Sequence, residues 1–452
     1  MFDRDSRRTV RRRHRSSRAI GWAAFAFSAL PLSASAQILR SSPEPPDVYE
    51  LSSPIEPTQY ERDPESPRVI SNPDFFCTYC SREGRIAIES REEIKDALEI
   101  EITYPLPLEG RKSRRHGEFR LMERAGQEVV DALFHDKKID DPVFIEDRMF
   151  RLFTAFDGFS TRKDKYPRRE EELEQLSVIF PEISEKTVKL SPHHRAHLYL
   201  IRAHRVLRDF EAAVHFDPKA EYMTYAGPYL GVNGKFEIYI FGDQRAMNEF
   251  RATYLGHKTE LDGECWHTLR DDSMVAIMHA ENLKDVWLNN TFTYRLSYNF
   301  IQCFRRYAYD LPSWLVLGWA HLMERRERTD FNTFTFGEGR LPDSMWGASR
   351  WKPDVRRRVL GDDVRPLVEL ANFTQANDVQ PNEHGIVWSW VSYLLQLDSD
   401  KFARFVNIVE DKQQGESIYN LQVRAFQETY GRSMIELFED WKKWVVQTYP
   451  KR

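Results

Sequence analysis

Two apolar helices joined by a short proline turn constrain the fold of this chain more than any other feature. They occupy residues 293–326, TYRLSYNFIQCFRRYAYDLPSWLVLGWAHLMERR. In the first helix, four side chains recur at helical spacing and predict one buried stripe: Leu296, Phe300, Phe304 and Tyr307. Tyr298 and Gln302 lie on the opposite side, as residues of an emptied pocket or of a wet surface do.

This helix pair resembles the core of gluzincin-type zinc metallopeptidases. In such enzymes an HExxH helix supplies two His ligands and a general base, because His at i and i+4 share one helix face. A turn similar to LPxWLxEGxA then opens the next helix, whose Glu is the third ligand. The chain retains most of that turn, as Leu311, Pro312, Trp314, Leu315, Gly318 and Ala320.

The resemblance extends over residues 192–446 to the peptidase-MA-like proteins of bacteria, including the domain of unknown function DUF1570. Three further segments carry it: KFEIYIFGDQRAMNEF at 235–250, GIVWSWVSYLL at 385–395 and AFQETYGRSMIELFEDWKKWV at 425–445. The resemblance implies a zincin-like fold, with a small sheet and helices in the C-terminal half.

The zinc ligands of such a family are absent from this chain. Aligned by hydrophobic pattern, HExxH falls on Tyr298, Asn299 and Gln302, and the third ligand position is Leu317. A shift of one residue gives Ser297, Tyr298 and Ile301 instead. Neither register offers the three N or O ligands that catalytic zinc needs, and no HExxH occurs elsewhere among the 13 histidines. We therefore expect no metal ion and no cofactor.

This interpretation predicts a pseudoenzyme, a catalytically inactive homologue. Its expected role is to bind a protein or peptide, or to be structural. Trp314 and Trp319 are typical of a core, but with His321 they are candidates for the wall of the former substrate groove. The alternative is an active zinc metallopeptidase that uses ligands not recognised in the sequence.

Residues 1–36 have the pattern of an export signal. Eight Arg between Arg4 and Arg18 precede an apolar run, and small residues end in Ala34-Ser35-Ala36. This predicts a protein of the periplasm or the cell exterior, with Sec and Tat export both open, and not membrane-spanning after cleavage. The signal carries a net charge of +6, so its removal takes the chain from −5 to about −11. Such an acidic protein is not expected to bind nucleic acid.

Four cysteines remain in the exported chain: Cys77, Cys80, Cys265 and Cys303. Two disulfides are expected, with Cys265–Cys303 the favoured long-range pair. Cys77-Thr-Tyr-Cys80 is open to three interpretations: a local disulfide, half of a metal knuckle, or a redox pair.

Two other groups of residues contain side chains that could carry chemistry. His193-His194-Arg195-Ala196-His197 has the i, i+4 spacing of a metal pair, but no third ligand with catalytic spacing follows it. Ser389 lacks the flanking glycines of a nucleophile elbow, although His384 is near it in the chain. Neither constellation predicts a catalytic site.

The predicted fold class is α+β and helix-rich, in four segments. Residues 1–36 are the signal, 37–70 a proline-rich disordered linker, 71–190 a mixed α/β region, and 191–452 the metallopeptidase-like domain. In the mixed region, strands are expected at 85–89 and 98–104, and helices at 121–134 and 144–156. In the last segment, strands are expected at 235–241 and 273–279, and helices at 192–215, 245–254, 364–372, 385–395, 401–411, 418–430 and 433–447.

Overall fold

The computed structural model describes residues 61–62, 70–71, 76–77, 80, 142–147, 149–161, 168–220, 226–252, 262–268, 272–307, 311–334 and 350–451. All of them belong to one compact unit, Pro43–Arg452. The signal segment lies outside the described residues, as do the strands expected at 85–89 and 98–104 and the helix expected at 121–134. Within the expected linker, β1 (Glu61–Arg62) pairs antiparallel with β2 (Ile70–Ser71) at the border of that segment.

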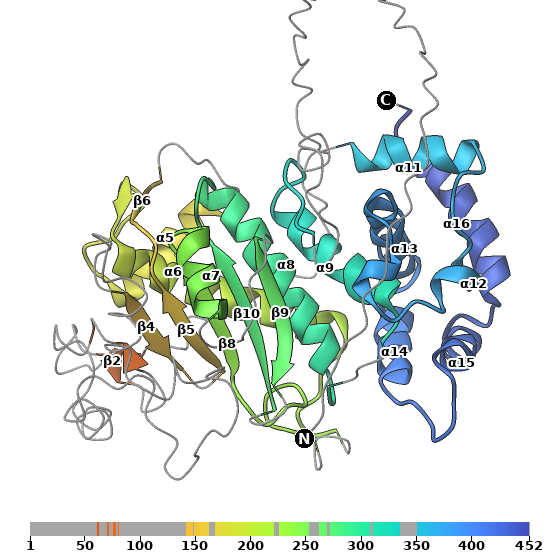
Figure 1. Ribbon diagram of the computed structural model, residues 1–452, viewed down its shortest axis with the longest axis horizontal. Coiled ribbons are helices and arrows are strands. Elements are labelled where there is room, and N and C mark those ends of the chain that lie inside the picture. The colour runs from red at the N-terminus through yellow and green to blue at the C-terminus, as the bar shows by residue number, and fades with distance from the viewer. Residues whose placement is uncertain are drawn as a thin grey trace, which may run out of the picture. The chain divides into compact units, whose positions relative to one another are not determined.

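A six-stranded mixed sheet forms one half of the described chain (Figure 1). Its order is β3-β4-β5-β8-β10-β9. The strands are β3 (Phe76–Cys77), β4 (Val143–Glu146), β5 (Phe150–Thr154), β8 (Phe236–Phe241), β10 (Ser273–His279) and β9 (Gly263–Thr268). The three central strands β5, β8 and β10 are parallel, whereas β3, β4 and the edge strand β9 pair antiparallel.

The two faces of the sheet are covered by different helices because side chains alternate along each strand. In β8, Ile238 and Ile240 face the main core under α6 (Pro192–Ala213) and α8 (Asp285–Cys303). Tyr239 and Phe241 point to the other face, where both rings contact Phe250 of α7 (Gln244–Phe250). All six residues of β8 are buried, as expected for a central strand covered on both faces.

The other half of the described chain consists of helices packed around α13 (His384–Leu397). Its closest neighbour is α9 (Ser313–Glu327), which also packs on α8 and so joins the helices to the sheet. Gly318 makes that packing close, because a Cβ there would lie 2.4 Å from the Val387 carbonyl oxygen. The remaining helices are α11 (Trp351–Leu360), α12 (Leu367–Leu370), α14 (Ser399–Val409), α15 (Ile418–Tyr430) and α16 (Met434–Thr448).

Local signals located most elements of the last segment correctly. The Ser191 hydroxyl accepts from the His194 N–H and begins α6 with Pro192 at its first position. Gly431 has φ of 65° and ends α15, and Ser433 begins α16 with a capping box. The coarse fold class is confirmed: the protein is α+β and helix-rich, with one small mixed sheet.

The helix expected at 144–156 is wrong. This run forms the hairpin of β4 and β5, with register pairs such as Phe144 with Phe153. Between the strands, the Asp147 carboxylate accepts from the backbone N–H groups of Met149 and Phe150 at 2.8 and 2.7 Å. This local hydrogen bonding favours a turn over a continuous helix. The next helix along the chain is α5 (Arg169–Ile179).

Candidate functional site

The positions expected to replace the zinc ligands lie on α8 and α9. Leu317 is fully buried and Asn299 is 1% exposed, whereas Tyr298 and Gln302 are half-buried. Tyr298 and Gln302 share a hydrogen bond one helical turn apart. Burial, with Cys265 and Tyr307 nearby, raises the pKa of Tyr298 well above its ordinary value. This side of α8 therefore faces β9 near Cys265, with the Arg295 guanidinium close by.

Tyr294 connects this face of α8 to α9. Its ring lies 6.4 Å from the ring of Tyr298 and 4.9 Å from the ring of His321. His321 follows Leu317 by one turn of α9, so both side chains lie on the same helix face. The contact between α8 and α9 at this level is thus a packed aromatic cluster, with Leu317 in the core beside it.

His321 is the centre of a buried hydrogen-bonded chain that the sequence did not predict. Its Nδ1 lies 2.6 Å from an oxygen of Glu324, and its Nε2 lies 2.6 Å from Nδ1 of His384. Burial raises the pKa of the Glu324 carboxyl well above its ordinary value. Burial, together with His384 and Arg325, lowers the pKa of His321 well below its own. Burial therefore favours the protonated form of Glu324 and the neutral form of His321.

The candidate groove wall is not formed as expected. Trp314 is fully buried and donates from Nε1 to the Gln422 side-chain oxygen at 2.8 Å. Trp319 is 1% exposed and packs on Phe210 and Phe402. Both indoles are core residues that join α9 to its neighbouring helices, because burying a large ring stabilises the packing more than leaving it in a groove.

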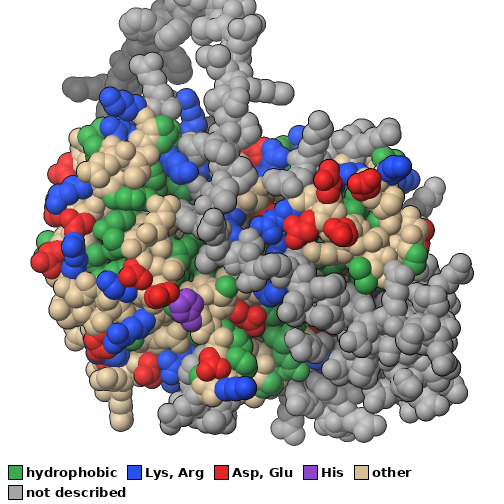
Figure 2. All heavy atoms as spheres, turned by 180° about the vertical axis from the view of Figure 1, so that it is seen from behind, with side chains coloured by type: hydrophobic (Ala, Val, Ile, Leu, Met, Phe, Trp, Pro, Cys, Tyr) green, Lys and Arg blue, Asp and Glu red, His purple; other side chains and the backbone are tan. Residues whose placement is uncertain are grey.

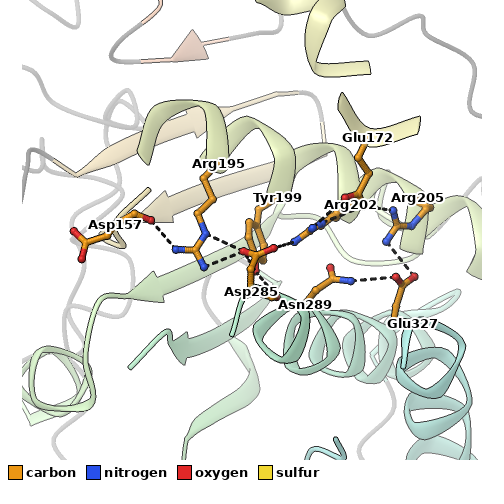
Figure 3. Close-up of polar contacts among 9 residues, drawn as sticks. All are labelled: Asp157, Glu172, Arg195, Tyr199, Arg202, Arg205, Asp285, Asn289 and Glu327. Atoms are coloured by element: carbon orange, nitrogen blue, oxygen red, sulfur yellow. Dashed lines mark hydrogen bonds and ion pairs between the residues drawn. The ribbon is translucent and has the colours of Figure 1, made fainter. Parts of the chain in front are cut away.

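A buried ionic network joins α5, α6, α8 and α9 (Figure 3). Arg195 of α6 pairs with Asp285 of α8 at 2.9 Å and donates to the Asp157 carbonyl at 2.6 Å. Arg202 bonds to the other oxygen of Asp285 at 3.0 Å, and Arg205 reaches Glu327 of α9 at 3.0 Å. Each of these charged groups has an oppositely charged partner, as buried ions require. The network therefore fixes the positions of the helices relative to one another.

A polar pocket of ≈ 360 Å³ opens beside this network. Its lining follows the carboxyl ends of β5, β8 and β10, and includes Asp157, Asp243 and Lys284. Asp243 already caps α7 by accepting from the Ala246 N–H at 2.8 Å, and the Lys284 ammonium lies over the Trp287 ring. The Asp243 and Lys284 side chains therefore have partners within the fold, whereas Asp157 is exposed and accepts from Arg195 through its backbone carbonyl.

The cysteines do not form the expected disulfides. The structure describes all four, and none is in a disulfide. Cys265 lies 3.6 Å from the Arg295 carbonyl oxygen, and Cys303 lies 3.5 Å from that of Phe300. Burial raises the pKa of Cys265 to about 11 and that of Cys303 well above its ordinary value. Both are inert buried thiols.

Cys77 and Cys80 instead lie against two histidines of α6. The Nε2 atom of His193 is 3.3 Å from each sulfur, and Nε2 of His197 is 3.4 Å from Cys80 Sγ. The two Nε2 atoms are 3.1 Å apart. Folding therefore brings two motifs that are far apart in the sequence into one group of four buried side chains that could hold a metal ion. The paired spacings C-x₂-C and H-x₃-H were the signal that could have found this group.

The remaining candidates have structural partners. The Ser389 hydroxyl accepts from Trp441 Nε1 at 3.0 Å and from the Tyr449 hydroxyl at 2.9 Å. His384 bonds to His321 and is not a base for Ser389. Figure 2 shows that Lys and Arg are interspersed with Asp and Glu on the described part of one face. No described helix is long and apolar enough to cross a bilayer.

Comparisons with known proteins give no relative for this chain. No family model matches it, and neither a curated protein nor a solved structure does. The arguments for its function are therefore those of its own residues and their geometry.

Proposed function

We propose that this protein is an exported, zincin-like protein without peptidase chemistry that binds a protein or peptide in extended form. The order of elements supports the fold: β8, α7, the edge strand β9, β10, then α8 and α9. A metallopeptidase subdomain presents the same order of strand, helix, strand and site helix. The arrangement holds a helix and an edge strand side by side, whether or not a metal is bound.

The observation that carries the proposal is the set of side chains between α8 and α9. Hydrolytic zinc needs three protein ligands and an open position for water. At this level the described residues offer Tyr294, Tyr298 and Leu317, and His321 has both ring nitrogens within 2.6 Å of other side chains. This set supports packing and hydrogen bonding, since the donor atoms of His321, Glu324 and His384 are bonded to one another.

Binding is the activity that this geometry still supports. In the described chain, β9 pairs with β10 only and ends the sheet, so its outer edge can receive an added strand. Trp266 of β9 is half-buried, and Tyr298 stands beside Cys265 of the same strand. An extended peptide could thus pair with the β9 backbone and contact these side chains.

Two measurements test the proposal. The mature protein, supplied with zinc, should not cleave a mixture of fluorogenic peptides. It should nevertheless retain members of a random peptide library, and the double variant Tyr298→Ala, Gln302→Ala should retain them about tenfold less strongly. The matched control is Tyr419→Ala, Gln427→Ala, which makes the same changes on α15.

Each of the two measurements has an outcome that would contradict the proposal. Hydrolysis that requires zinc and is lost in the Tyr298 and Gln302 variant would support the alternative, an active metallopeptidase. Equal peptide retention by both double variants would place binding away from β9 and α8 and overturn the proposed surface.

A further inference from the structure

We propose that Cys77, Cys80, His193 and His197 bind one Zn²⁺ ion in a closed, structural Cys₂His₂ site. The four donor atoms all lie within 4.8 Å of one another, and all four residues are buried. Around tetrahedral zinc, two nitrogens lie about 3.3 Å apart and a nitrogen and a sulfur about 3.6 Å apart. The distances here are 3.1 Å between the nitrogens and 3.3–3.4 Å between nitrogen and sulfur.

Hydrogen bonding alone does not account for this group. The Nε2 atom of His193 has three close neighbours: the sulfurs of Cys77 and Cys80, and Nε2 of His197. A ring nitrogen has one proton or one lone pair in the ring plane, so it can satisfy one of them. Four donor atoms that converge on one point are instead arranged as ligands of a shared cation.

The chemistry of the donors selects the metal. Two thiolates and two imidazoles form the tetrahedral S₂N₂ set that zinc prefers, whereas Mg²⁺ and Ca²⁺ prefer oxygen. The positive N-terminus of α6 favours thiolates next to it.

The site is structural because it is closed. Four protein ligands leave no position for substrate or water. The Phe180 ring covers one side, with its centroid 5.1 Å from the His193 ring and 4.9 Å from the His197 ring. None of the four ligands comes from α8 or α9, so the site stands independently of the proposed binding function.

The metal ion would stabilise the short strand β3, which carries Cys77. β3 has two residues and pairs only with β4 among the described strands, which is too little hydrogen bonding to hold an edge segment. The ion would connect this segment to the first turns of α6, over 116 residues of sequence between Cys77 and His193. Arg195 lies between the two His ligands in the sequence. The first turns of α6, which would bind the ion, therefore also carry the ion pair between Arg195 and Asp285.

Elemental analysis of the purified mature protein tests the site. We expect one zinc per chain, and most of it should be lost in Cys80→Ser and in His197→Gln. The affinity should fall more than about 100-fold, since even losing a group behind a ligand costs 10- to 100-fold. His194→Gln and Cys265→Ser are matched controls that should keep the metal, because His194 pairs with Glu182 and Cys265 lies near Arg295.

A second measurement keeps the test valid if the ligand variants fail to fold. Wild-type protein exchanged into Co²⁺ should show thiolate-to-cobalt charge transfer and the visible bands of tetrahedral cobalt. Peptide mapping should find Cys77 and Cys80 without a disulfide after the metal is removed under non-oxidising conditions. A Cys77–Cys80 disulfide in the native protein, or zinc retained by the double variant Cys77→Ser, Cys80→Ser, would overturn the site. Retained zinc would then point to α8 and α9 and count against the proposed function as well.

Discussion

Glu172 of α5 and Arg202 of α6 form a bidentate ion pair inside the protein. Arg202 Nε lies 3.1 Å from one carboxylate oxygen and Nη2 lies 3.0 Å from the other, and both side chains are 1% exposed. Arg205 also donates to Glu172, so one carboxylate bonds to two guanidinium groups. Parallel N–H donors suit a carboxylate, and this geometry orients α5 against α6.

Replacing Glu172 by Gln should strongly destabilise the fold at neutral pH. The change removes the carboxylate that two buried guanidinium groups share and leaves them Asp285 and Glu327 as partners; breaking a buried ion pair costs about 3–5 kcal/mol. Urea unfolding should show this loss in the midpoint at pH 7. The control Glu170→Gln, at an exposed position of the same helix, should leave the midpoint nearly unchanged.

The same variant should remove part of the acid sensitivity of the protein. Burial opposes ionisation of Glu172, but Arg202 and Arg205 outweigh it and lower its pKa below 4.5 in the folded state. Stability from this group is therefore present above pH 4.5 and lost as the pH falls through the lowered pKa. The difference in unfolding free energy between wild type and Glu172→Gln should narrow below pH 4.5. A constant difference down to pH 3 would contradict this assignment.

Gly318→Ala should disrupt the packing of α9 on α13. The new methyl group would lie 2.4 Å from the Val387 carbonyl and 2.6 Å from a Val391 methyl, so the helices must separate. Such overpacking costs about 1–3 kcal/mol. Gly361→Ala is the control, because its Cβ would meet no atom closer than 3.4 Å and its φ is −88°. Thermal unfolding of the two variants checks the expectation, which is wrong if both melt alike.

Ser389→Ala should lower stability without changing any activity of the protein. The substitution removes the acceptor of Trp441 Nε1 and of the Tyr449 hydroxyl, and a buried donor left without an acceptor costs about 1–3 kcal/mol. Ser399→Ala, at an exposed position, is the control. Denaturant unfolding measures the cost. If the variant were stable but had lost a hydrolytic activity, that result would instead identify Ser389 as the nucleophile of that activity.

The sequence by itself determined the elements whose signals are local. Ser191 and Pro192 begin α6, Gly431 ends α15, and Ser433 with Glu436 begins α16, because each signal acts within a few residues of the backbone that it caps. The apolar stripe of α8 is correct for Leu296 and Phe300, and Phe300 packs on Phe150, Phe210 and Phe236, but the helix ends at Cys303, before Phe304 and Tyr307. Helical spacing is enough to predict a buried face.

The tertiary structure decided what depends on distant partners. The run 144–156 reads as a helix by its apolar spacing, yet β8 pairs with it and makes Phe150–Thr154 a strand. Trp314 and Trp319 became core residues only because α14 and α15 supply the surfaces that cover them.

The candidate metal site shows the same division most clearly. Cys77-x-x-Cys80 and His193-x-x-x-His197 are each visible in the sequence, and each alone is more often something else. A metal site needs four donor atoms at one point, and only the packing of β4 against α6 brings residues 116 apart to that distance. Sequence spacing fixes which side chains share a face, whereas tertiary packing fixes which faces meet.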